Sequence, residues 1–112
     1  AGIRAEFLDM LDIDCLEVFN AAVTSRSYNE KASAYASSRG LSGTASSDAH
    51  HKSAAGIAYT EFDLPELSVP ALLDALRRGG RPVGNYLTFR EGLKKHFANW
   101  FRIVNRRPPA EK

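Results

Sequence analysis

Residues 41–62 read LSGTASSDAHHKSAAGIAYTEF, and this stretch decides the fold class. Its first six residues form a short, uncharged segment that permits a β-strand. Its last residues, from Ala58 to Phe62, are again apolar and β-favouring. Between them the turn SDAHH places an aspartate and two histidines where the first strand ends. Because α/β proteins keep their chemistry at strand ends, this turn is the first candidate for a functional site.

The segments on either side add helices and one more strand. The run around CLEVF is apolar and bounded by polar residues, as a buried strand is. An alanine-rich segment after it ends at Gly40, where a helix C-terminus favours a residue that tolerates positive φ. The sequence therefore predicts a short helix in 3–12, a strand at 15–20, a helix over 27–39, a helix from Ser68 to the glycines at 79–80, a break over 81–87 and a final helix over 88–105.

The alternation of strands and helices predicts an α/β fold built on a few short parallel strands with flanking helices and a C-terminal helix. Two or three strands make a poor sheet alone, so we expect a partial (β/α) barrel-like unit that belongs to a larger structure, with the rest of it before residue 1. The chain divides into residues 1–80, the α/β part, and residues 81–112, a basic C-terminal helix and tail.

Composition limits the alternatives. At 112 residues the chain has room for one domain, and no apolar run approaches the roughly 20 residues that a membrane span needs. The single cysteine, Cys15, has no partner for an internal disulfide, so a cytoplasmic location is expected. We read Cys15 as a small core residue, since nothing nearby would activate its thiol.

The charge is divided along the chain. Residues 1–76 carry five Lys/Arg against eleven Asp/Glu, whereas residues 77–112 carry ten against two. The basic end could meet nucleic acid, an anionic lipid surface or an acidic protein face. A helical stripe of Phe89, Leu93, Phe97 and Trp100 favours packing of this segment on the protein body, and we expect no nucleic-acid binding.

Asp48 and His50 have the spacing of a metal site. One residue apart on an extended segment, their side chains point to the same side, with Cα atoms roughly 6 to 7 Å apart. Carboxylate oxygen and imidazole nitrogen are ligands that zinc, iron or manganese accept. The alternative is structural: Asp48 caps the next turn and His50 lies on the surface.

Three further polar residues have open roles. Glu17 and Asn20 lie on the strand at 15–20, and either could line a site at its end. Strand alternation could instead turn Glu17 outward to solvent. His51 would face away from His50 on an extended chain, and we expect it to be exposed rather than a ligand.

Three segments together resemble a known family. LEVFNA (16–21), SYNEKASAYASSRGL (27–41) and TASSDAHHKSAAGIAYTEF (44–62) resemble the C-terminal part of the PHP family, the polymerase and histidinol phosphatase metallohydrolases. The resemblance covers residues 2 to about 80, including the segment associated with the PHP domain. It implies a distorted (β/α)₇ barrel that holds two or three divalent metal ions, zinc, manganese, iron or magnesium, which activate water against a phosphate ester.

Within the resemblance, Asp48 and His50 match the last pair of metal ligands. The opening H-x-H pair, the internal acidic ligand and the middle histidines of the family have no counterpart in residues 1–112. We therefore expect the C-terminal portion of a metal-dependent phosphoesterase, inactive alone, whose partner is the N-terminal part of the barrel or a second copy. The alternative is a non-catalytic interaction module that binds an acidic partner or nucleic acid through its basic C-terminal helix.

Overall fold

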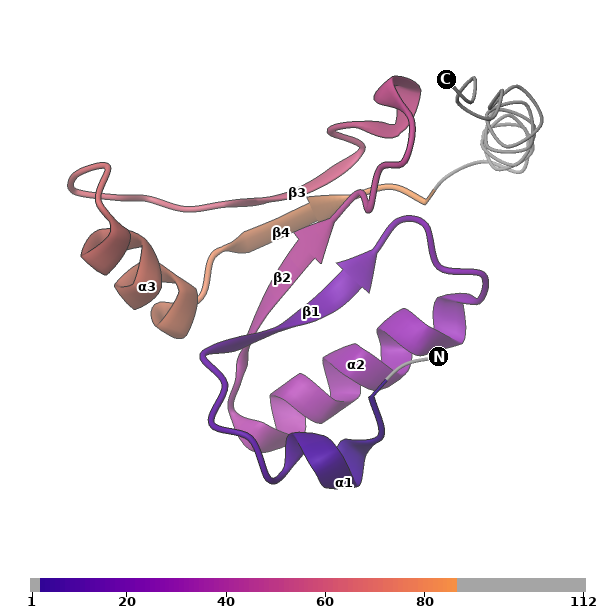
Figure 1. Ribbon diagram of the computed structural model, residues 1–112, viewed down its shortest axis with the longest axis horizontal. Helices are drawn as coiled ribbons and strands as arrows, with labels where there is room; N and C mark the ends of the chain where they lie inside the picture. Colours follow the sequence, from indigo (N-terminus) through magenta and orange to yellow (C-terminus); the bar gives the residue numbers. More distant parts are fainter. Residues whose placement is uncertain (1–2, 87–112) are drawn as a thin grey trace, which may run out of the picture.

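The computed structural model describes residues 3–86 and shows a mixed α/β fold with two small sheets (Figure 1). The final helix predicted over 88–105 lies outside the described residues. The elements are α1 (Ala5–Leu8), β1 (Cys15–Asn20), α2 (Arg26–Arg39), β2 (Ser42–Ser46), a 3₁₀ turn (Lys52–Ala54), β3 (Ala58–Glu61), α3 (Val69–Arg78) and β4 (Arg81–Gly84).

β1 and β2 pair in parallel, and α2 connects them and packs against them (Figure 1). The hydroxyl of Ser25 caps the start of α2 by accepting a hydrogen bond from the backbone N–H of Ser27. Gly40 ends the helix with φ of 65°, a left-handed conformation that glycine adopts without strain. The predicted strand–helix–strand order is confirmed for this part of the chain.

A bulge interrupts the register of β1. Glu17 lies opposite Thr44 and Phe19 lies opposite Ala45, so Val18 is an extra residue. A Cβ on Gly43 of β2 would lie 2.6 Å from a Val18 methyl carbon, and only glycine leaves the bulged side chain this space. The extra residue shifts the alternation of side chains between the two faces of the sheet. Two residues separated by an odd number of positions across the bulge can therefore point to the same face.

β3 and β4 form an antiparallel pair, so the break predicted over 81–87 is wrong for residues 81–84. Pro82 lies in β4, and proline within a run argues against a strand because it cannot donate to a ladder. It is tolerated here because β4 is at the edge of a two-stranded sheet, with Pro82 opposite Thr60. The pairing extends past β4 through the N–H of Asn85, which donates to the carbonyl of Ile57 at 3.0 Å.

One side chain links the two sheets. The hydroxyl of Thr60 in β3 accepts from the backbone N–H of Ala45 in β2 at 2.8 Å and donates to its carbonyl at 3.1 Å. The hydroxyl thus satisfies backbone groups that a neighbouring strand would otherwise bond. At the other end of β2, the Ser42 hydroxyl donates to the carbonyl of Leu76 and so connects the strand to α3.

α1 is shorter than the predicted helix but is fixed to α2 by a polar contact. The Asp9 carboxylate accepts from the Tyr35 hydroxyl at 2.6 Å and from the Arg39 guanidinium at 2.8 Å. The hydrogen bond from Arg39 has the larger effect and the bond from Tyr35 the smaller one, and together they hold the pKa of Asp9 below its usual value. This contact orders the chain that leads into β1.

The buried residues of the described part are small. The apolar side chains that are buried are alanines: Ala21, Ala36, Ala45, Ala54, Ala58 and Ala75. Several large apolar side chains are exposed on α1, on α3 and in the segments next to them: Ile3, Phe7, Met10, Leu11, Leu67, Val69, Leu72 and Leu73. Over residues 3–86, no helix has the length and apolarity needed to cross a membrane.

Candidate functional site

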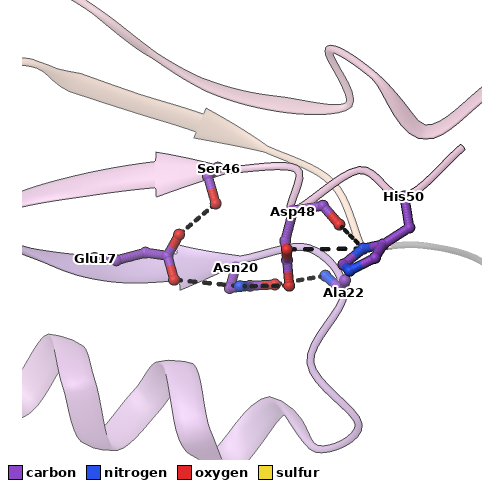
Figure 2. Close-up of polar contacts among 6 residues, drawn as sticks. All are labelled: Glu17, Asn20, Ala22, Ser46, Asp48 and His50. Carbon is purple, nitrogen blue, oxygen red and sulfur yellow. Dashed lines mark hydrogen bonds and ion pairs between the residues drawn. The ribbon is translucent and has the colours of Figure 1, made fainter. Parts of the chain in front are cut away.

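Polar side chains gather where the parallel strands end (Figure 2). Because neighbouring parallel strands end at the same edge of a sheet, residues after β1 and β2 come close in space even when they are far apart in sequence. The cluster consists of Glu17 and Asn20 from β1, Ser46 from β2, and Asp48 and His50 from the turn after β2. All four site residues predicted from the sequence belong to it.

The side-chain amide of Asn20 is the centre of this cluster. Its Nδ2 donates to Oε2 of Glu17 and to Oδ2 of Asp48, each at 3.2 Å. Its Oδ1 accepts from the backbone N–H of Ala22 at 2.8 Å, which fixes which way the amide faces. Two carboxylates therefore converge on one donor group, in a position that favours positive charge.

Glu17 turns toward this cluster rather than into the core. It is exposed, yet both carboxylate oxygens are engaged, since Oε1 accepts from the Ser46 hydroxyl and Oε2 from Asn20. The bulge explains how Glu17 and Asn20 meet, because residues three apart on a regular strand point to opposite faces. The sequence pattern offers no signal for that bulge.

Asp48 lies two residues beyond β2 in an unusual backbone conformation. Its φ is 46°, in the left-handed region that aspartate tolerates better than most residues. This turn directs the carboxylate back toward the end of β1, where Asn20 holds one of its oxygens. About half of the side chain, 47%, remains exposed.

The His50 ring is held by a hydrogen bond to the backbone of Asp48. Its Nδ1 lies 2.8 Å from the carbonyl oxygen of Asp48, and since a carbonyl only accepts, Nδ1 carries the proton. In the neutral ring with this tautomer, Nε2 has the free lone pair, and within residues 3–86 Nε2 makes no hydrogen bond. Nδ1 is also 3.8 Å from Oδ1 of Asp48.

The neighbouring histidine has a different environment. Nδ1 of His51 lies 2.9 Å from the hydroxyl of Ser53 and accepts from its backbone N–H at 3.3 Å, which caps the 3₁₀ turn. Nδ1 of His51 therefore bonds within the 3₁₀ turn, whereas Nδ1 of His50 bonds the carbonyl of Asp48. Cys15, at the start of β1, is half-buried, and burial raises the pKa of its thiol.

The sequence model of a family described as PHP-associated matches residues 26–80. We call residues 26–80 the PHP-associated segment. The PHP-associated segment contains Asp48 and His50, whereas Glu17 and Asn20 precede it. Searches of the curated proteins and of the solved structures found no match to the chain.

Asp48 and His50, at the edge of the parallel sheet, fit part of a metal site. A carboxylate and an imidazole nitrogen with a free lone pair suit zinc, manganese or iron. Within residues 3–86, however, no three or more His, Cys, Asp or Glu side chains are grouped so that they could hold a metal ion together. The described part therefore offers two candidate ligands, fewer than the three or four that protein zinc sites use.

Two contributors to this region are not predicted from the sequence. Asn29, in the PHP-associated segment, is buried and bonds the backbone of Asn20, and Tyr86 lies against Phe19 with ring centroids 4.8 Å apart. A polar residue on the sheet-facing side of an alanine-rich helix is a usable signal, since asparagine is seldom buried. The position of Tyr86 depends on β4, which the pattern does not indicate.

Proposed function

We propose that the chain is the C-terminal portion of a metal-dependent phosphoesterase of the PHP kind, with Asp48 and His50 as metal ligands. The supporting observation is the geometry of His50, whose Nδ1 donates to the Asp48 carbonyl and whose Nε2 is left with a free lone pair. Metal-binding histidines typically donate their other ring nitrogen in this way. That the PHP-associated match covers this turn supports the same proposal.

In this proposal the residues of the chain bind and orient. Asp48 supplies a carboxylate oxygen and His50 supplies Nε2, while Asn20 holds the other oxygen of the Asp48 carboxylate. A bound divalent ion lowers the pKa of water and neutralises phosphate oxygens, which relieves the protein of supplying a strong base. Zinc, manganese, iron and magnesium are the candidates, and further ligands would come from other parts of a PHP barrel.

A larger barrel would also cover surface that the described part leaves open. β1 and β2 pair only with each other within residues 3–86, and large apolar side chains on α1 and α3 are exposed. Isolated strand pairs and exposed apolar patches are both features that proteins cover. We propose that the remainder of a (β/α) barrel, or a second copy of the chain, packs there.

The interaction-module alternative remains a second proposal. Asp48 adopts a left-handed turn conformation that suits aspartate whether or not a metal binds. In that case the turn is structural and residues 81–112 supply a basic surface for an acidic partner. We also propose a cytoplasmic location, because Cys15 has no cysteine with which to form an internal disulfide.

The test uses the longest natural product of the gene that contains residues 1–112. We expect an H-x-H motif roughly 100 to 200 residues before Ala1, as a one-domain barrel requires. Purified protein should contain metal and hydrolyse p-nitrophenyl phosphate or its diester, and Asp48→Ala or His50→Ala should remove both properties. His51→Ala is the matched control, because it removes the adjacent imidazole without touching Asp48.

Two results would contradict the proposal. One is a gene product that begins at residue 1 and carries no additional ligands. The other is a longer protein whose metal content and hydrolysis survive both Asp48→Ala and His50→Ala.

A further inference from the structure

Asn29 is a buried polar side chain in the middle of the helix–sheet contact. It is only 7% exposed, although an amide that enters the protein interior loses its bonds to water. Every polar group of its side chain is engaged. Oδ1 accepts from the backbone N–H of Asn20 at 3.0 Å, and Nδ2 donates to the carbonyl of Asn20 at 3.0 Å and to the Tyr86 hydroxyl at 3.3 Å.

The two bonds to Asn20 replace a neighbouring strand. At the end of β1, the next residue, Ala21, bonds toward β2 through the carbonyl of Ser46, so the N–H and C=O of Asn20 point the other way. The amide of Asn29 supplies one acceptor and one donor there. It therefore fixes the backbone of Asn20 from α2, on the side where the described sheet has no further strand.

We propose that Asn29 is a positioning residue for the site at the end of β1 and β2. It fixes the backbone of Asn20, and the Asn20 side chain in turn holds the carboxylates of Asp48 and Glu17 (Figure 2). This inference rests on the proposed function in one respect, which is that Asp48 is a metal ligand. The connection from α2 to the Asp48 carboxylate is a chain of hydrogen bonds, each of 3.0 to 3.2 Å.

A packing role alone does not account for the residue at this position. Further along α2, Ala36 occupies a comparably buried position with a small apolar side chain. An alanine at position 29 would be a small apolar residue like Ala36, but it would remove both side-chain bonds to the backbone of Asn20. The amide therefore does more than pack, because it pairs the backbone of Asn20 and also bonds the Tyr86 hydroxyl.

The first measurement follows the Asn20 side-chain amide by NMR in the 112-residue chain. Asn29→Asp keeps the size but cannot donate to the Asn20 carbonyl, and Asn29→Ala removes both bonds while avoiding a buried charge. We expect both variants to shift the Asn20 Nδ2 proton signals and to speed their exchange with water at least several-fold. Ala36→Gly, which weakens the same helix without touching Asn20, should leave these signals unchanged.

The second measurement is the affinity for Mn²⁺, read from line broadening near Asp48. At equal fractions of folded protein, Asn29→Ala, which adds no charge, should weaken binding about tenfold more than Ala36→Gly, the scale of losing a residue that orients a ligand. Unmoved Asn20 signals in both Asn29 variants would overturn the inference, as would equal affinities in Asn29→Ala and Ala36→Gly.

The two proposals fail in different ways. If the wild-type chain shows no Mn²⁺ effect near Asp48 while the Asn20 signals respond to Asn29 as expected, the metal assignment fails and the positioning role stands. If Mn²⁺ binds at Asp48 and the Asn20 signals do not change in the Asn29 variants, the positioning role fails and the metal assignment stands.

Discussion

The two sheets of this small protein are joined in different ways. In the parallel half, β1, α2 and β2 are connected by polar side chains that bond the backbone, such as Asn29 to Asn20. In the antiparallel half, β3 and β4 pair with each other and carry a surface ion pair between Arg81 and Glu61, and glycines make close contacts there. The parallel half therefore presents carboxylates and an imidazole at the edge where β1 and β2 end, and this edge is where we propose the functional site.

The largest expected effect concerns the glycine contacts of the antiparallel half. A Cβ on Gly80 would lie 2.6 Å from the carbonyl oxygen of Glu61 and 2.5 Å from the ring of Phe62. Backbone cannot move aside as a side chain end can, so Gly80→Ala should lower the free energy of unfolding by about 3 kcal/mol, the upper range for overpacking. Urea denaturation followed by circular dichroism measures this.

In the parallel half, Gly43→Ala should lower the free energy of unfolding by less than Gly80→Ala does, and it should also disturb the site. A Cβ on Gly43 would meet the Val18 methyls, which can shift, so Gly43→Ala should cost about 1 to 2 kcal/mol. Because Val18 is the bulged residue, the contact between Glu17 and Asn20 should change as well, visible in the Asn20 side-chain NMR signals. If Gly80→Ala disturbs those signals as much as Gly43→Ala does, the two halves are not distinct.

The smallest effect is the pH dependence of the contact that fixes α1. Arg39 and Tyr35 lower the pKa of Asp9, so the stability from this contact is present above the unfolded value of about 3.8 and is lost as pH falls through the lower folded value. Asp9→Asn should therefore lower Tm slightly at pH 7, and the difference from wild type should close as pH falls below about 3.8. A difference that stays constant as pH falls below this value would exclude the ion pair as its cause.

The sequence predicts the parallel half better than the antiparallel half, for a physical reason. β1, α2 and β2 each carry local signals, an apolar run, a cap or a terminal glycine, and these are confirmed. β4 depends on pairing with a strand about twenty residues earlier and contains Pro82, so local pattern argues against it.

The site divides in the same way. Asp48 and His50 stand out as a short motif, and they follow the end of β2 as expected, but Asp48 adopts a left-handed turn instead of the expected extended conformation. The meeting of Glu17 with Asn20 depends on a bulge, and the support from Asn29 depends on how α2 packs. Neither feature has a local signature, because both arise from contacts between segments far apart in the chain.

The central claim is that Asp48 and His50 bind a divalent metal, and a Mn²⁺ titration of the ¹⁵N-labelled 112-residue chain tests it most directly. Two ligands supply only part of the binding free energy of a complete site, so we expect weak binding. Line broadening should nevertheless centre on residues 48 and 50, disappear in Asp48→Ala and persist in His51→Ala. Broadening that is absent, spread over the whole acidic surface, or unchanged in Asp48→Ala would contradict the account.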